Sequence, residues 1–445
     1  MPQVAERHET YAADFEAFRH TPAFGPEWLR TARTAAFARF IERGFPTTRD
    51  EEWKFTNVAP IAAMEFHPVG AAETTPDDRA GVGRGLSRAD LEPFLFRDAF
   101  RFQAVVINGR LSASLSSLSG LPDGVTVTSL AEAMTAQPPL EGPSLKSDHP
   151  FVLLNTAFCE GGVFIHIAPK VVLTEAIHVL FVSAPGSRPA LVAPRLFVVA
   201  GEQSQASIVE NYAGLGDSPV LTTAVTEVLL GPGAMVDHVK VQRETAAAFH
   251  MASTFVHLHR ASTFTSQAIT FGGRIARNDI TATLAGDGAE CTLNGLYVAD
   301  GDTLVDTHTT IDHAMPHCPS HEVYKGILAG RAKAVFNGKI IVRPDAQKTD
   351  AKQTNKALLL SDEAGINTKP QLEIFADDVK CTHGAAIGQL DPDQLFYLRA
   401  RGIGHEDARN MLIHAFASDV LNGIRHEAVR ARLEEALVEK LHLPV

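Results

Sequence analysis

The chain has few cysteines, no block of basic residues and no long apolar run. Its 445 residues include only four cysteines, none in a Cys-x-x-Cys pair: Cys159, Cys291, Cys318 and Cys381. A formal net charge of −12 disfavours nucleic-acid binding, which needs clustered Lys and Arg. No apolar run reaches the roughly 18 residues of a membrane span, and MPQVAERHETYAADF lacks the apolar core of a secretory signal. We therefore expect a cytoplasmic protein with reduced thiols, bound to neither nucleic acid nor membrane.

Two common enzyme signatures are also missing. The sequence contains no G-x-x-x-x-G-K-[ST] loop, so it does not encode an ATPase of the P-loop kind. It contains no G-x-S-x-G either, and the residues nominate no Ser/His/Asp triad. The three lysines within residues 346–356 are best interpreted as a solvated polar ladder. We therefore do not expect a complete active site on this chain.

The N-terminal part, residues 1–95, is predicted to be helical and to end in a linker. TARTAAFARFIERG has apolar residues at helical spacing and Gly44 as a C-cap. RDEEWKFTNVAPI follows, with Trp53 and Phe55 as expected packing anchors. AAETTPDDRAGVGRGLSRAD, residues 71–90, is rich in Gly, Ala and charge and is typical of a loose linker.

Residues 96–388 form a long series of predicted short strands. Segments such as AIHVLFVSA and TFVHLHRAS are dense in β-branched and aromatic residues, with Gly or Pro between them. A helix is predicted around DHPFVLLNTAFCEG. Gly-x-Gly-Ala occurs at residues 231–234 and again at 286–289, an offset of 55 residues. This loose self-similarity favours the stacked coils of a β-helix over a β-sandwich with similar turns.

The C-terminal part, residues 389–445, is predicted to hold three helices. Asp391 suits an N-cap and Pro392 the first helical position. The second helix begins near residue 405 and the third covers RHEAVRARLEEALVEKLHL. The second helix carries an apolar stripe that could bury one face or meet a partner. The stripe consists of Ala408, Met411, Leu412, Ala415 and Phe416.

The stretch ADDVKCTHGAA, residues 376–386, places a thiol two residues before an imidazole. On a strand, Cys381 and His383 would point to the same face, about 6.6 Å apart along the chain. Both groups are competent ligands for iron and zinc. Spacing alone leaves three readings open: a metal or sulfur-transfer site, a nucleophile with its base, or packing in a β core.

A second candidate cluster lies in DTHTTIDHAMPHCPSHEVYKG, residues 306–326. It contains five His and Cys residues with two aspartates nearby, and so many possible ligands raise the hypothesis of a zinc site. These are His308, His313, His317, Cys318 and His321, with Asp306 and Asp312. The candidate zinc ligands are His313, His317, Cys318 and His321. Pro316 and Pro319 exclude the helix on which a His-x-x-x-His pair usually binds zinc. Side chains stacked along a β-helix explain the cluster equally well.

Residues 303–401 as a whole resemble the SufB/SufD family of iron–sulfur cluster assembly proteins. The similarity extends almost without a break from TLVDTHTTIDHAMPHCPSHEVYKG to QLDPDQLFYLRAR. The Cys-x-His-Gly motif at residues 381–384 and the N-terminal RDEEWKFT resemble the SufD branch more than the SufB branch. Thr382 and Ala386 stand where Ser and Thr are common, and neither change removes a metal ligand.

The resemblance implies a mainly β fold, with a right-handed parallel β-helix core between N-terminal and C-terminal helical domains. It implies a scaffold subunit, not an enzyme, that pairs with a SufB-like paralogue. The C-terminal helices would dock a SufC-like ABC-type ATPase, whose ATP-driven movements would expose the paralogue interface. An exposed β-helix edge would also allow a homodimer of the isolated chain.

The same resemblance assigns roles at the Cys-x-His-Gly motif. His383 becomes the stronger candidate ligand of iron or of a nascent cluster, and Cys381 a second ligand or sulfur acceptor. The cluster would be transient and would lie at the paralogue interface, with none expected on the isolated chain. A reduced flavin is compatible with the assembled complex.

Two other functions compete with this interpretation. A zinc-dependent hydrolase would use the cluster at residues 306–321. A β-helix enzyme that acts on polysaccharide would need paired carboxylates along a groove, whereas Asp377 and Asp378 are adjacent and would point to opposite faces of a strand.

Overall fold

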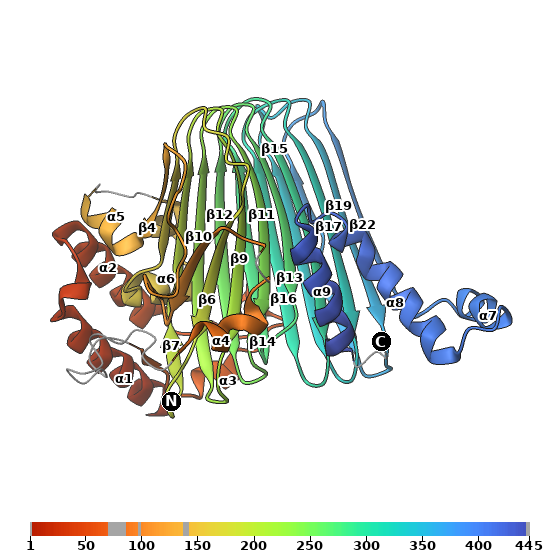
Figure 1. Cartoon of the computed structure of the whole chain (residues 1–445), viewed down its shortest axis with the longest axis horizontal. Coiled ribbons are helices and arrows are strands. Elements are labelled where there is room, and N and C mark those ends of the chain that lie inside the picture. Colours follow the sequence, from red (N-terminus) through yellow and green to blue (C-terminus); the bar gives the residue numbers. More distant parts are fainter. Residues whose placement is uncertain (1, 70–85, 97–98, 137–141, 442–445) are drawn as a thin grey trace.

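Runs of β-branched and aromatic residues form two facing, mostly parallel sheets in the computed structural model (Figure 1). The structure describes residues 2–69, 86–96, 99–136 and 142–441. Successive long strands alternate between the two sheets, so each pair of strands adds one coil to a parallel β-solenoid. The predicted parallel β-helix core is confirmed, and the β-sandwich alternative is wrong.

The two sheets share the strands almost evenly. The first sheet contains β4 (Val125–Ser129), β5 (Val163–Ile167), β8 (Arg195–Ala200), β10 (Val220–Leu230), β12 (Phe249–Leu258), β14 (Ile275–Leu284), β16 (Leu304–His313), β18 (Lys333–Val342), β20 (Gly365–Thr368) and β21 (Gln371–Ile374), with β1 (His67–Pro68) and β7 (Ala190–Val192) beside them. The second sheet contains β2 (Phe102–Ile107), β3 (Arg110–Leu111), β6 (Ile177–Ser183), β9 (Gln205–Gly214), β11 (Met235–Arg243), β13 (Thr263–Thr270), β15 (Glu290–Ala299), β17 (Pro319–Leu328), β19 (Asp350–Leu359) and β22 (Lys380–Gly388).

The repeated Gly-x-Gly-Ala phrase marks a repeated turn between the sheets. Met235 is in register with Thr263, and Thr263 with Glu290, so two coils span the 55-residue offset. At the turns, Gly233 and Gly288 have φ angles of 67° and 69°. Glycine populates this left-handed region readily because it has no Cβ, which explains its recurrence there.

The solenoid interior is filled by alternate residues of each strand, stacked from coil to coil. Val236, Phe264 and Cys291 lie in register on three successive coils, and all three are buried in the main apolar cluster. Cys291 is therefore a core side chain. Each coil covers the apolar face of its neighbour, which is the source of stability in a solenoid.

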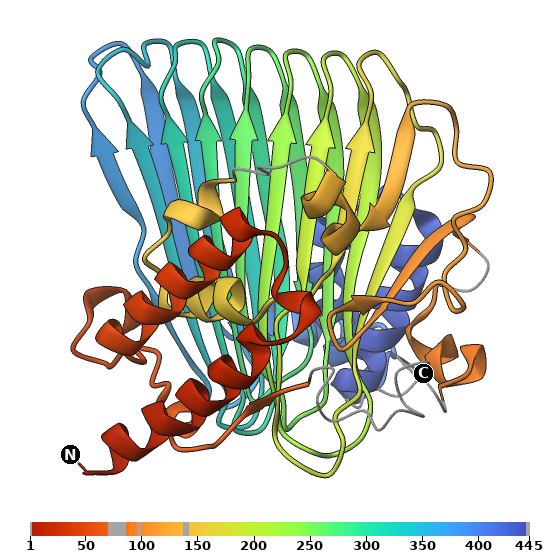
Figure 2. The same cartoon turned by 90° about the vertical axis from the view of Figure 1, so that its left-hand side faces the viewer.

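Helices from the N-terminal half cover the outer face of the first sheet (Figure 2). They are α1 (Pro2–Arg19), α2 (Glu27–Arg43) and α6 (Pro150–Phe158), and α6 packs on α2, β10 and β12. Gly44 ends α2 by donating its N–H to the carbonyl of Phe40 at 2.7 Å, as predicted. The helix predicted around residues 148–161 is α6, and the predicted linker at 71–90 lies mostly outside the described residues. The shorter elements are η1 (Pro22–Phe24), η2 (Glu51–Trp53), α3 (Ala59–Ala62), α4 (Arg88–Leu91), η3 (Glu92–Phe94), α5 (Leu130–Ala136) and η4 (Pro143–Lys146).

The RDEEWKFT segment is fixed to the solenoid through Trp53. The guanidinium of Arg277, on β14, lies 3.8 Å from the centre of the Trp53 ring. That guanidinium also pairs with Asp306 at 2.7 Å and donates to the carbonyl of Glu52 at 2.8 Å. Trp53 is only 4% exposed, as expected of an anchor, but Phe55 is 43% exposed and faces solvent. The prediction for Phe55 is therefore wrong.

Three helices follow the last strand: α7 (Pro392–Ala400), α8 (His405–Leu421) and α9 (Glu427–Lys440). The Asp391 side chain accepts hydrogen bonds from the backbone N–H groups of Asp393 and Gln394, which confirms the predicted N-cap. Part of α8 and α9 lie on the outer face of the second sheet, while α7 projects away from the solenoid (Figure 1). None of the helices in the described ranges combines the length and apolarity that a membrane crossing requires.

The buried face of α8 differs from the predicted stripe. The buried residues of this helix are Ala408, Ile413, Ala417, Val420 and Leu421. Met411 and Ala415 are exposed, and Leu412 and Phe416 are half-buried. The spacing of apolar residues is compatible with burial of either of two adjacent stripes on α8. Packing on the second sheet buries the stripe through Ile413. Lys325, whose Nζ lies 4.6 Å from the centre of the Phe416 ring, marks the edge of that contact.

We expect Trp53→Ala to lower the free energy of unfolding by about 3–5 kcal/mol, because it removes a buried ring and the partner of the Arg277 guanidinium. Urea unfolding followed by circular dichroism measures this loss. Phe55→Ala is the matched control, and a surface substitution of that kind changes stability by about 0.5 kcal/mol or less. Equal losses in the two variants would contradict the anchoring role of Trp53.

Candidate functional site

The Cys-x-His-Gly motif lies on β22, the strand that ends the second sheet. β22 pairs in parallel with β19, and among the described strands it has no neighbour on its other edge. It lies at the end of the solenoid that is distant from the N-terminal helices (Figure 1). Cys381 and His383 are two residues apart on this strand, so both point to the same face, the inner face of the last coil.

Cys381 and His383 share a face but differ in their surroundings. Cys381 is half-buried and packs on an apolar cluster that includes Val342, Ala351 and Val379. Burial raises the pKa of the Cys381 thiol, so at neutral pH the sulfur carries its proton. His383 is exposed and lies in register with Gln353 of β19. The pair thus offers a protected thiol beside an accessible imidazole.

No other described segment of the chain covers the end of the solenoid that carries this motif. A Cβ built on Gly384 or Gly388 would find no heavy atom within 4 Å. Three large apolar side chains are exposed at the same end, Ile374 at 40%, Phe375 at 65% and Ile387 at 48%. An unpaired strand edge flanked by exposed apolar groups is a surface for pairing with another chain.

The structure does not bring the candidate zinc ligands of the His-rich segment, residues 306–326, together. These are His313, His317, Cys318 and His321. His313 points into the core, where Nε2 lies 3.0 Å from Oγ of Ser320, and burial lowers its pKa to about 4. Cys318 is buried and donates to the carbonyl of Gly286 at 3.4 Å. His317 is exposed in the turn before β17, and His321 lies on the opposite strand face to inward-facing Ser320. The described residues contain no cluster of three or more His, Cys, Asp or Glu arranged to hold a metal ion.

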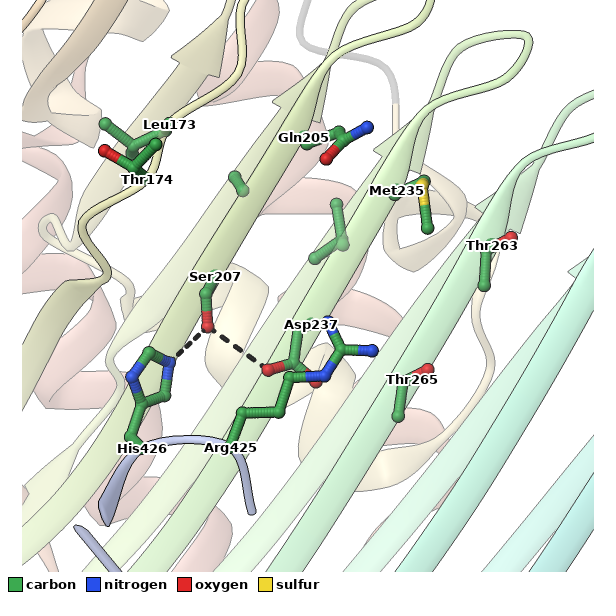
Figure 3. A pocket seen from close by; sticks show the side chains of 12 residues that line it. Leu173, Thr174, Gln205, Ser207, Met235, Asp237, Thr263, Thr265, Arg425 and His426 are labelled. Atoms are coloured by element: carbon green, nitrogen blue, oxygen red, sulfur yellow. Dashed lines mark hydrogen bonds between the residues drawn. The ribbon is translucent and has the colours of Figure 1, made fainter. Parts of the chain in front are cut away.

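A cleft of about 230 Å³ lies between the second sheet and the connection from α8 to α9 (Figure 3). Its walls come from β9, β11 and β13 on one side and from Arg425 and His426 on the other. Inside it, Oγ of Ser207 lies 2.6 Å from Nε2 of His426 and 3.3 Å from a carboxylate oxygen of Asp237. Burial lowers the pKa of His426 despite the nearby Asp237 charge.

This Ser–His–Asp group is not arranged for nucleophilic catalysis. Asp237 contacts the hydroxyl of Ser207 and makes no contact with the imidazole of His426 that would orient it. In a catalytic triad the imidazole accepts the serine proton and the carboxylate contacts the imidazole. The three residues therefore hold the connection between α8 and α9 against the sheet.

Sequence reasoning found the Cys381–His383 pair but missed what surrounds it. The exposed Ile374, Phe375 and Ile387 carry no periodic signal, because Ile374 ends the last short strand of the first sheet, Phe375 follows it, and Ile387 lies on β22. Ser207 and His426 are 219 residues apart, so no local pattern could have joined them. The position of Gln353 beside His383 depends on the length of one coil, which the repeats alone did not define.

Comparison with known proteins gives consistent matches along the chain. Residues 181–416 match the family model described as the SufBD core domain of SUF system FeS cluster assembly, and residues 97–179 match the SufBD protein N-terminal region. The chain is 33% identical to an iron–sulfur cluster assembly SufBD family protein of Synechocystis sp., over 88% of this chain and 86% of that protein. It is 28% identical to the iron–sulfur cluster assembly protein SufD of Escherichia coli, over 91% of each chain. The SufD of Bacillus subtilis is 25% identical over 94% of each chain.

Cys381 is expected to be the one cysteine that iodoacetamide modifies in the folded protein, because the other three are buried. Its raised pKa predicts slow alkylation at pH 7 and a rate that keeps increasing above pH 8.5, about the ordinary thiol pKa. Mass spectrometry of tryptic peptides gives the rate at each pH, with urea-unfolded protein as the control in which all four cysteines react. Rapid modification of Cys381 at pH 7 would contradict the protected, protonated thiol.

Proposed function

Because this chain belongs to the SufBD family of iron–sulfur cluster assembly proteins, we propose that it acts as a SufD-like scaffold subunit. In this role it pairs with a SufB-like paralogue through the open end of its solenoid. It also docks a SufC-like ATPase through its C-terminal helices. Iron and sulfide are the cargo of the complex, which assembles a nascent cluster and passes it on.

One observation carries the proposal: Cys381 and His383 face inward on a terminal strand whose outer edge has no partner among the described strands. Thiolate and imidazole are ligands that suit iron and iron–sulfur clusters. Two side chains supply only half of the four ligands that a cluster normally takes. A paralogue strand placed against β22 would supply the others, and its departure would release the cluster.

The protonated thiol of Cys381 suits a site that binds iron transiently better than a site that holds iron permanently. Burial raises the pKa of Cys381, so iron must displace the thiol proton before sulfur can bind. His383 is accessible at the same face and needs no such step when its ring is neutral. We therefore assign the first contact with iron to His383, and sulfur capture or second ligation to Cys381.

The proposal predicts that Cys381→Ala or His383→Ala lowers the iron and acid-labile sulfide content of the complex at least several-fold. The sample is the full chain purified anaerobically with its SufB-like and SufC-like partners. Thr382→Ala is the matched control, because it lies between the two residues and points to the opposite face of β22. Normal iron and sulfide in both site variants, with the complex assembled, would overturn the proposed role of this strand.

The C-terminal helices offer a separate surface for the ATPase. Met411 and Ala415 are exposed on α8, and on α7 Phe396 is 72% and Tyr397 56% exposed. Exposed aromatic and methionine side chains are characteristic of protein interfaces. The chain itself has no P-loop, so ATP chemistry is assigned to the docked partner. ATP-driven closure of the partner would move the two scaffold subunits and open the interface at β22.

Met411→Asp is expected to weaken binding of the SufC-like ATPase about tenfold or more, since a charge would be buried in an apolar contact. Isothermal titration calorimetry of the purified chain with that ATPase measures the change. Met315→Asp is the control, because Met315 is also exposed, at 38%, but lies on a turn of the solenoid. If Met411→Asp and Met315→Asp bind like the wild type, α8 is not the docking surface.

A further inference from the structure

A buried row of polar side chains leads from the solenoid interior to His383. His383 is in register with Gln353 on β19, and Gln353 is in register with Glu322 on β17. All three positions lie on the inner face of the second sheet. Gln353 and Glu322 are 2% and 1% exposed, so this row connects the core to the open end.

The Gln353 amide is held in one orientation by Glu322, its in-register neighbour on β17. Its Nε2 donates to a carboxylate oxygen of Glu322 at 2.8 Å. Across the interior, Gly338 of β18 leaves the space that this amide occupies, since a Cβ there would lie 2.1 Å from Nε2. The amide nitrogen is therefore committed to Glu322 and packed against the glycine.

The other end of the same amide has no partner. Oε1 of Gln353 is buried and makes no hydrogen bond within the described part of the chain. A buried carbonyl without a donor costs about 1–3 kcal/mol, so such an atom normally meets one. In-register neighbours on adjacent strands are about 4.8 Å apart, which places the ring of His383 within reach of a glutamine side chain. His383 is the in-register neighbour on the open side.

We infer that Gln353 is a positioning residue for His383: when the exposed ring turns toward the interior, its N–H supplies the donor that Oε1 of Gln353 lacks. The inference rests on the proposed role of His383 in binding iron. With one ring nitrogen donating to Gln353, the proton is fixed there and the lone pair of the other nitrogen faces the iron. Metal-binding histidines generally have such a partner, which selects the tautomer and the ring orientation. Glu322 accepts from the amide nitrogen of Gln353 and thereby keeps the amide oxygen pointed toward the open end.

The most direct test is the tautomer of His383 in the free full-length chain. Long-range ¹H–¹⁵N spectra of ¹⁵N-labelled protein report ring tautomers, and a His383→Ala spectrum identifies the signals of His383 among the 19 histidines. We expect one neutral tautomer in the wild type and a mixture in Gln353→Met, which keeps the side-chain length but has no acceptor oxygen. Glu322→Gln should give an intermediate result. A tautomer mixture in the wild type, or identical His383 signals in wild type and Gln353→Met, would overturn the inference.

Iron binding gives the second readout, with Asn355→Leu as the matched control. Asn355 is also a buried, inward amide of β19, but its in-register neighbour is Ala385, which has no ring to orient. In the complex with its SufB-like and SufC-like partners, Gln353→Met should bind Fe(II) about 10- to 100-fold more weakly by chelator competition. Asn355→Leu should bind Fe(II) like the wild type.

The two readouts separate the failure of this inference from the failure of the proposed function. If His383→Ala binds Fe(II) as tightly as the wild type, His383 is not the ligand, whereas the tautomer comparison still decides the role of Gln353. If His383→Ala loses Fe(II) and Gln353→Met does not, the proposed function stands and the inference about Gln353 is wrong.

Discussion

The structure depends on parallel stacking of coils in register, because each coil buries the side chains and backbone groups of its neighbour. Residues on one inward row, such as Val236, Phe264 and Cys291, repeat this contact from coil to coil. The constraint has an unavoidable consequence at the end of the solenoid, where the last strand has no further described strand to pair with on its outer edge. β22 is that strand, and it carries both Cys381 and His383. The location of the site thus follows from the same rule that builds the core.

Polar groups inside the solenoid also follow a coil-to-coil rule. In the middle of the core Glu210 has hydrogen-bond partners: it accepts from the Tyr212 hydroxyl at 2.5 Å and contacts Nε2 of His238 at 2.8 Å. Near the open end, Gln353 donates to one carboxylate oxygen of Glu322, while Oε1 of Gln353 has no partner within the described residues. Buried polar atoms normally have a hydrogen-bond partner. The unpartnered Oε1 of Gln353 is therefore best explained as the acceptor for the next side chain toward the open end, His383.

Composition and pattern predicted much of the fold but less of the site. The turn phrases containing Gly233 and Gly288 indicated stacked coils, and Asp391 indicated the start of α7, because glycine conformation and N-capping act locally. The sequence did not indicate which apolar stripe of α8 is buried, since two were available and only tertiary packing could select the one through Ile413. The sequence could not predict that Gln353 is the neighbour of His383, because this depends on an inter-coil register that no local pattern encodes.

The central claim is that the unpaired edge of β22 is covered by a partner strand during cluster assembly. Hydrogen–deuterium exchange of the peptide containing residues 380–388 tests it most directly, first in the isolated chain at a concentration where it is monomeric, then with the SufB-like paralogue bound. The account predicts that exchange of this peptide slows strongly in the complex, while β12 peptides from mid-solenoid stay unchanged. Equal exchange of the β22 peptide in both states would contradict the account, because the strand that carries Cys381 and His383 would then lie outside the interface.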